Sequence, residues 1–248
     1  MAELSWKGLV LPAAALAAWS LAVENHLLGG PMAVSPVALV QVPVTDPDGR
    51  EIWAALGASL VRLALGGSLG AVAGIGLGLA LGLSRTLGRA LSPSVDTLRQ
   101  IALFAWIPLL TTWFGNSETA KIVFIALGTF FPLVLATQQG VRATPAGLVE
   151  LVRVLGLSPR RRITALYLPS ALPSIAMGVQ IALISAWIGT VGAEYAIGNG
   201  RGLGAYIASG REQFRMDITL VGVLALALVG VALHALGARL IRHLDKAT

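Results

Sequence analysis

The sequence contains no cysteine, which excludes disulfide bonds, thiolate metal sites and cysteine-based catalysis. Its three histidines, His26, His234 and His243, are scattered along the chain, so no metal site is expected. It lacks a phosphate-binding loop of the Gly-x4-Gly-Lys-Ser/Thr type, and no pair of carboxylates or nucleophile with a base stands out. We therefore expect no cofactor and no enzymatic activity in this chain.

Charged residues are also scarce, at 12% of the 248 residues, whereas hydrophobic residues make up 56% and the mean hydropathy is +0.79. This balance lies outside that of soluble domains and indicates an integral membrane protein in contact with lipid. The net charge of +6 resides between the apolar runs and is not combined with an array of aromatic and basic residues. Nucleic acid is therefore not an expected partner.

Six apolar segments are long enough to cross the hydrocarbon layer, which needs about 20 residues. They are residues 6–25, 56–83, 94–114, 119–140, 171–195 and 218–240. We interpret the first as a retained anchor rather than a signal peptide, because no small-residue cleavage site is followed by a soluble domain. The sequence thus predicts an all-α integral membrane protein with an N-terminal transmembrane helix at 1–28, an external loop at 29–52 and a core domain at 53–248.

Lysine and arginine accumulate in alternate connections, which predicts the orientation of the chain in the membrane. The side richer in these residues, predicted to be cytoplasmic, carries Lys7, Arg85, Arg89, Arg99, Arg142, Arg153, Arg160, Arg161, Arg162, Arg239, Arg242 and Lys246. Both termini are then cytoplasmic, and the chain is a multi-pass membrane protein. The segments 29–52, rich in proline and polar turn residues, and 196–216 are predicted to be external.

The second span carries a glycine at every fourth position, at Gly66, Gly70, Gly74, Gly78 and Gly82. Such a stripe of small residues predicts close packing against a neighbouring helix, since lipid gives no hydrophobic drive for helix association. A phosphate-cradling role would need a preceding strand, and none is predicted.

Arg62, near one end of the same span, must pair, snorkel or face water. Glu194 and Glu51 are both possible partners, whereas Glu118 and Lys121 are expected to pair with each other. Polar and aromatic residues of the spans are candidates either for a transport pathway or for hydrogen bonds between helices. Together with Arg62 they are Gln100, Trp106, Thr111, Thr129, Gln138, Trp187 and Glu194.

The segment 144–170 is basic and lies between two spans. Leu151, Val154 and Leu155 share one face of a short predicted helix, and Gly156 permits a sharp turn after it. Ser158 and Pro159 are suited to the start of a second helix. The three arginines that follow are explained by membrane orientation alone.

This segment resembles the coupling loop of permease subunits of ABC (ATP-binding cassette) importers. The signature of that family reads Glu-Ala-Ala, three residues, Gly, nine residues, Ile, one residue, Leu-Pro. Glu150, Gly156, Leu168 and Pro169 are in register with it, whereas Leu151, Val152 and Leu166 replace the two alanines and the isoleucine. The stretches IPLLTTWFGNSETAKIVFIALGTFFPLVLATQQGVR, GLVELVRVLGLS, LPSALPSIAMGVQIAL and AEYAIGNGRGLGAYI resemble the nitrate, taurine and aliphatic-sulfonate branch, and within it the sulfonate subgroup.

The resemblance implies a type I importer permease that works by alternating access as a homodimer, with two cytosolic ATPases, which bind ATP and magnesium, and an external substrate-binding protein. It implies that the ATPases dock on Glu150, Leu151, Val152, Arg153, Gly156, Leu157 and Ser158. The expected substrate is an aliphatic sulfonate, and the alternatives are nitrate, bicarbonate, taurine or a thiamine-precursor pyrimidine. A secondary transporter or channel is the alternative from another class, although the internal repeat and acidic spans typical of many such proteins are not apparent.

Overall fold

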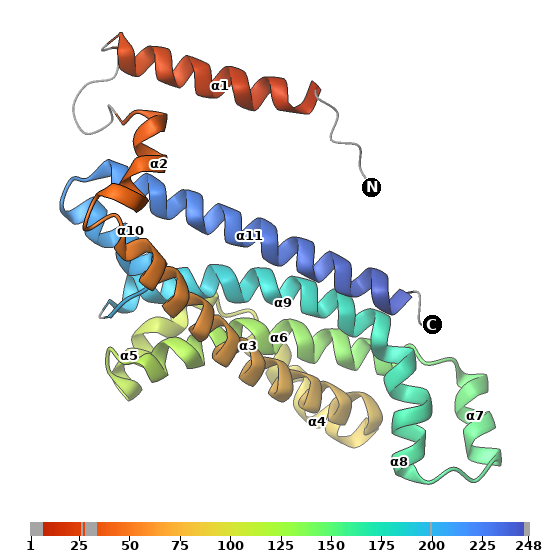
Figure 1. The fold of residues 1–248 in the computed structure, drawn as a ribbon. Coiled ribbons are helices and arrows are strands. Elements are labelled where there is room, and N and C mark those ends of the chain that lie inside the picture. Colours follow the sequence, from red (N-terminus) through yellow and green to blue (C-terminus); the bar gives the residue numbers. More distant parts are fainter. Residues whose placement is uncertain (1–6, 26, 28–33, 199, 246–248) are drawn as a thin grey trace. The chain divides into compact units, whose positions relative to one another are not determined.

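The computed structural model describes residues 7–25, 27, 34–198 and 200–245, and every regular element in these ranges is helical (Figure 1). This confirms the all-α class. The helices are α1 (Lys7–Glu24), α2 (Pro36–Thr45), α3 (Glu51–Leu83), α4 (Arg85–Leu98), η2 (Leu103–Trp106), α5 (Ile107–Phe114), α6 (Glu118–Arg142), α7 (Ala146–Val154), α8 (Pro159–Arg162), η3 (Ile163–Tyr167), α9 (Leu168–Ile197), α10 (Leu203–Glu212) and α11 (Met216–Asp245).

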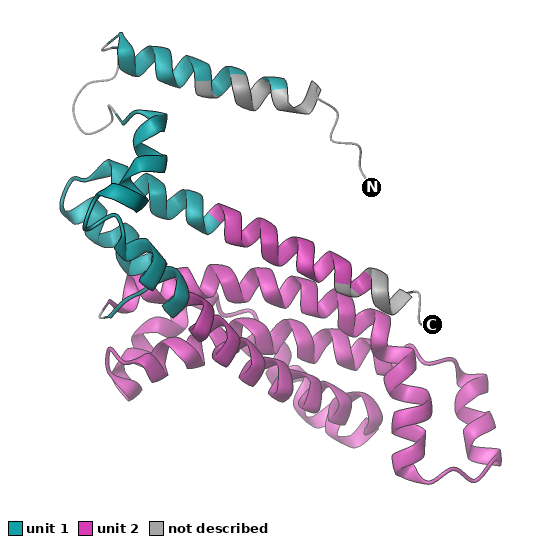
Figure 2. Ribbon diagram, in the orientation of Figure 1, with its two compact units in different colours: residues 1–58, 200–226 teal, residues 59–199, 227–248 magenta. Residues whose placement is uncertain are grey.

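The chain divides into two compact units, coloured separately in Figure 2. The first comprises residues 1–58 and 200–226, and the second comprises residues 59–199 and 227–248. Helices α3 and α11 each contribute to both units.

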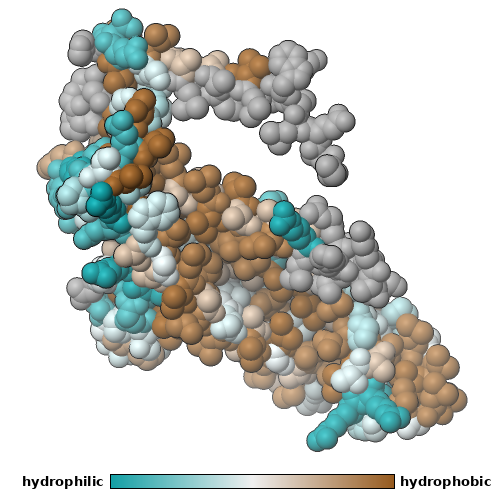
Figure 3. Space-filling model, viewed as in Figure 1, coloured by the Kyte–Doolittle hydropathy of each residue, from teal (hydrophilic) through white to brown (hydrophobic). Residues whose placement is uncertain are grey.

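Four helical segments of the described chain are long and apolar enough to cross a membrane: Glu51–Leu83, Glu118–Arg142, Pro159–Ile197 and Met216–Arg239. They contain the spans predicted at 56–83, 119–140 and 171–195, and nearly all of the one at 218–240. Figure 3 shows a predominantly hydrophobic surface over the long helices of the second unit. Such a surface suits contact with lipid tails.

The prediction of one continuous span at 94–114 is wrong, because helix α4 ends at Leu98 and residues 99–102 are not helical. The chain then continues through η2 and α5, where Pro108 occupies the first turn. Proline is tolerated there because a first-turn residue needs no backbone hydrogen-bond donor, whereas it breaks a helix interior.

The two pieces of this segment nevertheless contact opposite ends of α6. Gln138, near the end of α6, donates a 2.7 Å hydrogen bond to Ser92 of α4. Leu110 of α5 packs against Ala120, near the start of α6. The predicted crossing is therefore interrupted, and it consists of two helical pieces, α4 and Leu103–Phe114, of which only the second is apolar.

The predicted external loop 29–52 also contains a helix, α2, between Pro36 and Thr45. Ser35 caps it by accepting a hydrogen bond from the backbone N–H of Val37 at 3.2 Å, and Pro36 occupies the first turn. Prolines that suggested a loop are thus compatible with a short helix when one of them starts it. The segment 196–216 contains the helix α10, between Leu203 and Glu212.

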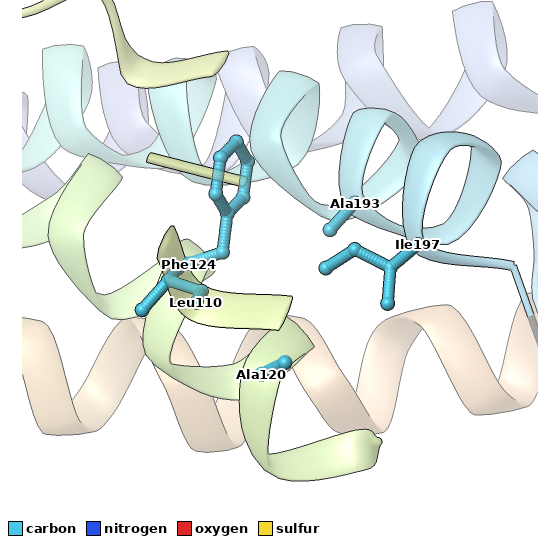
Figure 4. Packing of buried hydrophobic residues seen from close by; sticks show 5 residues of the cluster. All are labelled: Leu110, Ala120, Phe124, Ala193 and Ile197. Atoms are coloured by element: carbon cyan, nitrogen blue, oxygen red, sulfur yellow. The ribbon is translucent and has the colours of Figure 1, made fainter. Parts of the chain in front are cut away.

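Helices α6 and α9 form the centre of the second unit. Phe124 and Ala120 of α6 pack against Ala193 and Ile197 of α9, with Leu110 of α5 completing the cluster (Figure 4). All five side chains are buried. Small residues at this interface let the two helix backbones approach closely.

The five striped glycines of α3 lie against α6. A Cβ atom on Gly70 would lie 2.3 Å from the carbonyl oxygen of Ala126, and one on Gly74 would lie 2.7 Å from that of Phe130. The neighbouring Gly67, outside the stripe, has no atom within 4 Å of the same position. Close approach of α3 and α6 therefore requires glycine along this stripe.

Candidate docking surface and ion network

Helix α7 ends in a turn that depends on Gly156, which has a φ of +63°. The backbone N–H of Gly156 donates to the carbonyl of Arg153 at 3.1 Å, and that of Leu157 donates to Val152 at 3.2 Å. This pair of bonds defines a Schellman cap, in which glycine is favoured because the left-handed conformation crowds any Cβ atom. The helix and its stop at Gly156 follow the sequence prediction.

One side of α7 presents large apolar side chains to solvent. They are Leu148, Leu151, Val154 and Leu155, with Val154 85% exposed. Figure 3 shows this hydrophobic surface over α7, beside hydrophilic groups over α8. Single exposed leucines are ordinary, but a contiguous apolar face on one short helix indicates an interaction site.

The other side of α7 faces the body of the second unit across a cleft of about 700 Å³. Glu150 and Arg153 line this cleft together with Arg85, Arg89 and Arg142 of the neighbouring helices. The predicted docking residues are therefore divided: Leu151 lies on the apolar side, whereas Glu150 and Arg153 line the cleft.

The remaining predicted docking residues lie in or near the turn. Val152 and Leu157 are half-buried. Ser158 occupies the N-cap position of α8, but its side chain makes no capping hydrogen bond. The structure thus places Ser158 where the sequence indicated, without the expected capping interaction.

A network of ionised side chains joins α3, α6 and α9. The Nη1 atom of Arg62 donates to Glu194 at 2.7 Å, and its Nη2 atom donates to Glu118 at 2.9 Å. From the sequence, either Glu194 or Glu51 could be the partner of Arg62, and the structure pairs Arg62 with Glu194. Lys121 also contacts Glu118 at 3.2 Å, which is the expected pair.

The network combines Arg62 and Lys121 with the carboxylates of Glu118 and Glu194, and most of it is excluded from solvent. Glu194 and Lys121 are each 1% exposed, and the hydroxyl of Ser59 lies 2.8 Å from both carboxylate oxygens of Glu194. Ser59 was missed in the sequence, although its position three residues before Arg62 places both on one helix face. Such a buried, hydrogen-bonded arrangement is what charged groups within a membrane span require.

Of the other pathway candidates, three lie in the packed interior. Thr129 lines an apolar cavity of about 350 Å³ between α3, α6 and α9. Gln138 bonds to Ser92, as described above, and Trp187 is buried beside Gly230.

The last three candidates belong to the interrupted crossing. Gln100 is exposed in the non-helical break, and Trp106 in η2 packs at the edge of the apolar cluster of Figure 4. Thr111 donates to the carbonyl of Ile107 in its own helix at 3.0 Å. The structure therefore brings together only Arg62 and Glu194 among the eight candidates.

In the first unit, Arg215 joins the turn after α2 to the start of α11. It contacts Asp46 at 2.9 Å, Asp48 at 3.0 Å and Asp217 at 2.7 Å. Hydrogen bonds from Arg215 hold the pKa of Asp46 below its usual value, and hydrogen bonds to Asp46 and Asp217 raise the pKa of Arg215. One guanidinium is thus surrounded by three carboxylates.

Tyr206 of α10 also contacts the turn after α2, because its hydroxyl donates a hydrogen bond to the carbonyl of Gly49 at 3.2 Å. Burial of the phenol, with a smaller effect from Asp217, raises the pKa of Tyr206 to about 12. The neutral phenol is therefore the form that the folded chain stabilises.

The fold and sites described so far define a membrane-spanning helical subunit with an exposed apolar helix between two of its spans. Residues 70–248 match the family of binding-protein-dependent transport system inner membrane components, and the chain belongs to this family. It is a permease subunit of the ABC importer class.

Two relatives extend the match over most of the chain. The aliphatic sulfonates transport permease protein SsuC of Escherichia coli K12 is 38% identical over 89% of this chain and 83% of its own length. The protein of the same name in Bacillus subtilis 168 is 35% identical over 90% of this chain and 81% of its own length.

The fold is also similar to a solved structure, that of the MetNI methionine ABC transporter in an inward-facing conformation. The TM-score is 0.70 at 22% identity, over 81% of this chain and 99% of that one. The likeness shows that the two chains share the type I permease fold.

Proposed function

We propose that this permease imports a small organic anion, an aliphatic sulfonate, across the bacterial inner membrane. The similarity to the two SsuC proteins over most of their length supports this substrate. Both termini and the α7–α8 connection are then cytoplasmic, as the distribution of lysine and arginine favours.

The apolar face of α7 carries the proposal for the energy source. Leu151, Val154 and Leu155 form the centre of the surface on which a cytosolic ATPase docks, and the turn at Gly156 fixes the end of that surface. The ATPase supplies the sites for ATP and magnesium. Apolar helices that lie in a groove of a partner are a common mode of recognition.

The working assembly is two copies of this chain, two ATPases and an external binding protein that delivers the substrate. ATP-driven closure of the ATPases draws the docking helices together, and the spans rock to alternate access. The ion pairs of Arg215 with Asp46 and Asp48 hold the turn after α2 against the start of α11, on the side where the binding protein docks.

Arg62 is assigned a structural role in this mechanism rather than that of an anion ligand. Its charge is already offset by Glu118 and Glu194, so an incoming sulfonate would have to displace a buried carboxylate. Breaking such a pair costs roughly 3–5 kcal/mol, which is more than one additional contact with an anion returns.

The substrate is tested by reconstituting the complex in liposomes with its ATPase and binding protein. We expect alkanesulfonates to stimulate ATP hydrolysis and to enter the vesicles. Taurine, nitrate and bicarbonate, assayed side by side, provide the comparison. Stimulation by nitrate or bicarbonate with none by any sulfonate would refute the sulfonate proposal and leave the importer class intact.

Docking is tested separately at Gly156, where the structure distinguishes two roles. Gly156→Asn preserves the left-handed turn better than other residues, whereas Gly156→Val strains it. Apart from its two chain neighbours, no described atom lies within 4 Å of the added Cβ position, so the backbone conformation is the main difference between the two variants. We expect Gly156→Val to lose ATPase association; loss in Gly156→Asn as well would mean that the ATPase itself packs against this glycine.

A further inference from the structure

Arg99 lies at the break in the interrupted crossing, directly after α4. Its side chain lines a groove of about 410 Å³ with Pro132 and Gln139 of α6 and Ser174 of α9. From the sequence, Arg99 is expected on the cytoplasmic side, within the span predicted at 94–114. No role in the pathway was predicted for it.

The groove lies within the depth of the hydrocarbon layer. Residue 130 is the middle of α6, and the groove is lined by α6 residues from Phe131 to Gln139. At about 1.5 Å per residue, these lie roughly 1.5–14 Å from the middle of the helix. Half of the hydrocarbon layer is about 15 Å thick, so with α6 centred in the membrane Arg99 is an intramembrane cation.

The guanidinium of Arg99 retains hydrogen-bonding capacity. Its Nε atom donates to Asp96 at 3.0 Å, and no residue in the described ranges accepts a hydrogen bond from its two terminal nitrogens. The side chain is 38% exposed. Non-helical backbone with an exposed cation is tolerated at this depth only where it lines a water-filled cavity or is covered by protein.

The rest of the groove suits a ligand that is polar at one end and apolar along its length. Gln139 and Ser174 offer further hydrogen-bond donors near the arginine, whereas Met177 and Ile181 present exposed apolar side chains. The planar guanidinium of arginine donates paired hydrogen bonds to two oxygens of an oxyanion, and a short alkyl chain is stabilised by contact with apolar side chains.

We propose that Arg99 receives the sulfonate group of the substrate in this groove, while Met177 and Ile181 contact its alkyl chain. This inference rests on the proposed import of an aliphatic sulfonate. It distinguishes Arg99 from Arg62, whose guanidinium is committed to two carboxylates. It also explains a broken helix at this level, since discontinuous helices form substrate sites in other transporters.

The test compares Arg99→Gln with two matched variants in the reconstituted complex. Asp96→Asn removes the partner of Arg99 and keeps the cation, and Arg160→Gln removes an exposed arginine of α8 outside the groove. Butanesulfonate uptake is measured together with ATP hydrolysis stimulated by the loaded binding protein. Butanesulfonate binding to the detergent-solubilised complex, without binding protein, gives a direct dissociation constant.

We expect Arg99→Gln to weaken butanesulfonate binding by about 10- to 100-fold, the usual range for hydrogen bonds to a charged group. Uptake falls while stimulated ATP hydrolysis continues, because docking is unaffected. Asp96→Asn and Arg160→Gln retain binding, whereas a merely structural ion pair predicts equal losses for Asp96→Asn and Arg99→Gln. That equality, or wild-type binding by Arg99→Gln, would overturn this inference alone; failure of the wild-type complex to import any sulfonate would overturn the proposed substrate with it.

Discussion

Replacing Gly70 by alanine tests whether α3 and α6 depend on backbone contact. The added Cβ would lie 2.3 Å from the carbonyl oxygen of Ala126, and ordinary contact begins at 3.4 Å, so the helices must separate locally by 1.1 Å (3.4 minus 2.3). A carbonyl cannot rotate away as a flexible side chain can. Overpacking of this kind costs roughly 1–3 kcal/mol.

Gly67→Ala is the matched control, three residues away on the same helix. No atom lies within 4 Å of its Cβ position, and alanine gains up to about 1 kcal/mol of helix propensity over glycine. The two variants should therefore differ by about 2–4 kcal/mol, or on the order of 10 °C in the apparent Tm of the detergent-solubilised chain. Equal Tm values for Gly70→Ala and Gly67→Ala would show that the stripe does not hold the helices together.

Three further changes address the apolar face of α7, the ion network around Arg62 and the hydrogen bond of Tyr206. Val154→Asp should abolish co-purification with the ATPase without lowering the Tm of the chain, whereas Thr86→Asp, exposed on α4 outside the docking segment, should have no effect. Glu194→Gln should lower stability by about 3–5 kcal/mol, because it breaks a buried pair, and Glu118→Gln should lower it less, since that side chain is 53% exposed; equal Tm losses would contradict this difference. Because the pKa of Tyr206 is raised from its ordinary value of about 10 to about 12, the neutral phenol stabilises the folded chain. This contribution to folding stability is fully present below about pH 10 and is lost as the pH rises through about 12. Tyr206→Phe should remove this alkaline component from the stability profile and from the ultraviolet titration of tyrosine; persistence of both in the variant would refute the assignment.

The sequence contained enough information for the fold class, the long spans and the α7 turn, because each depends on local chemistry. Apolar length alone indicates a span, and a glycine after an amphipathic turn indicates a helix end. The glycine stripe likewise has a fixed period of four residues, which predicts a close helix contact, although the identity of the partner helix, α6, depends on tertiary structure.

The break in the segment 94–114 was harder to predict from the sequence, because hydropathy is averaged over a window that includes the interrupting residues. Arg99 and Gln100 lie beside an apolar stretch, so a window covering 94–114 still appears continuous. The partners of Arg62 could be predicted only in part, since Glu118 and Glu194 are 56 and 132 residues away in the sequence. Contacts across such separations are set by helix packing rather than by local pattern.

The two ends of helix α6 have different polar surroundings, and the cost of exposing them to water therefore differs. At its start, Glu118 and Lys121 belong to a largely buried ion network; at its end, Arg142 borders an open cleft lined by arginines. At the first end, Arg62 and Glu194 are both removed from water, and their mutual hydrogen bond offsets part of this desolvation cost. At the second end, the arginines line an open cleft and remain accessible to water, so that end carries no comparable desolvation cost.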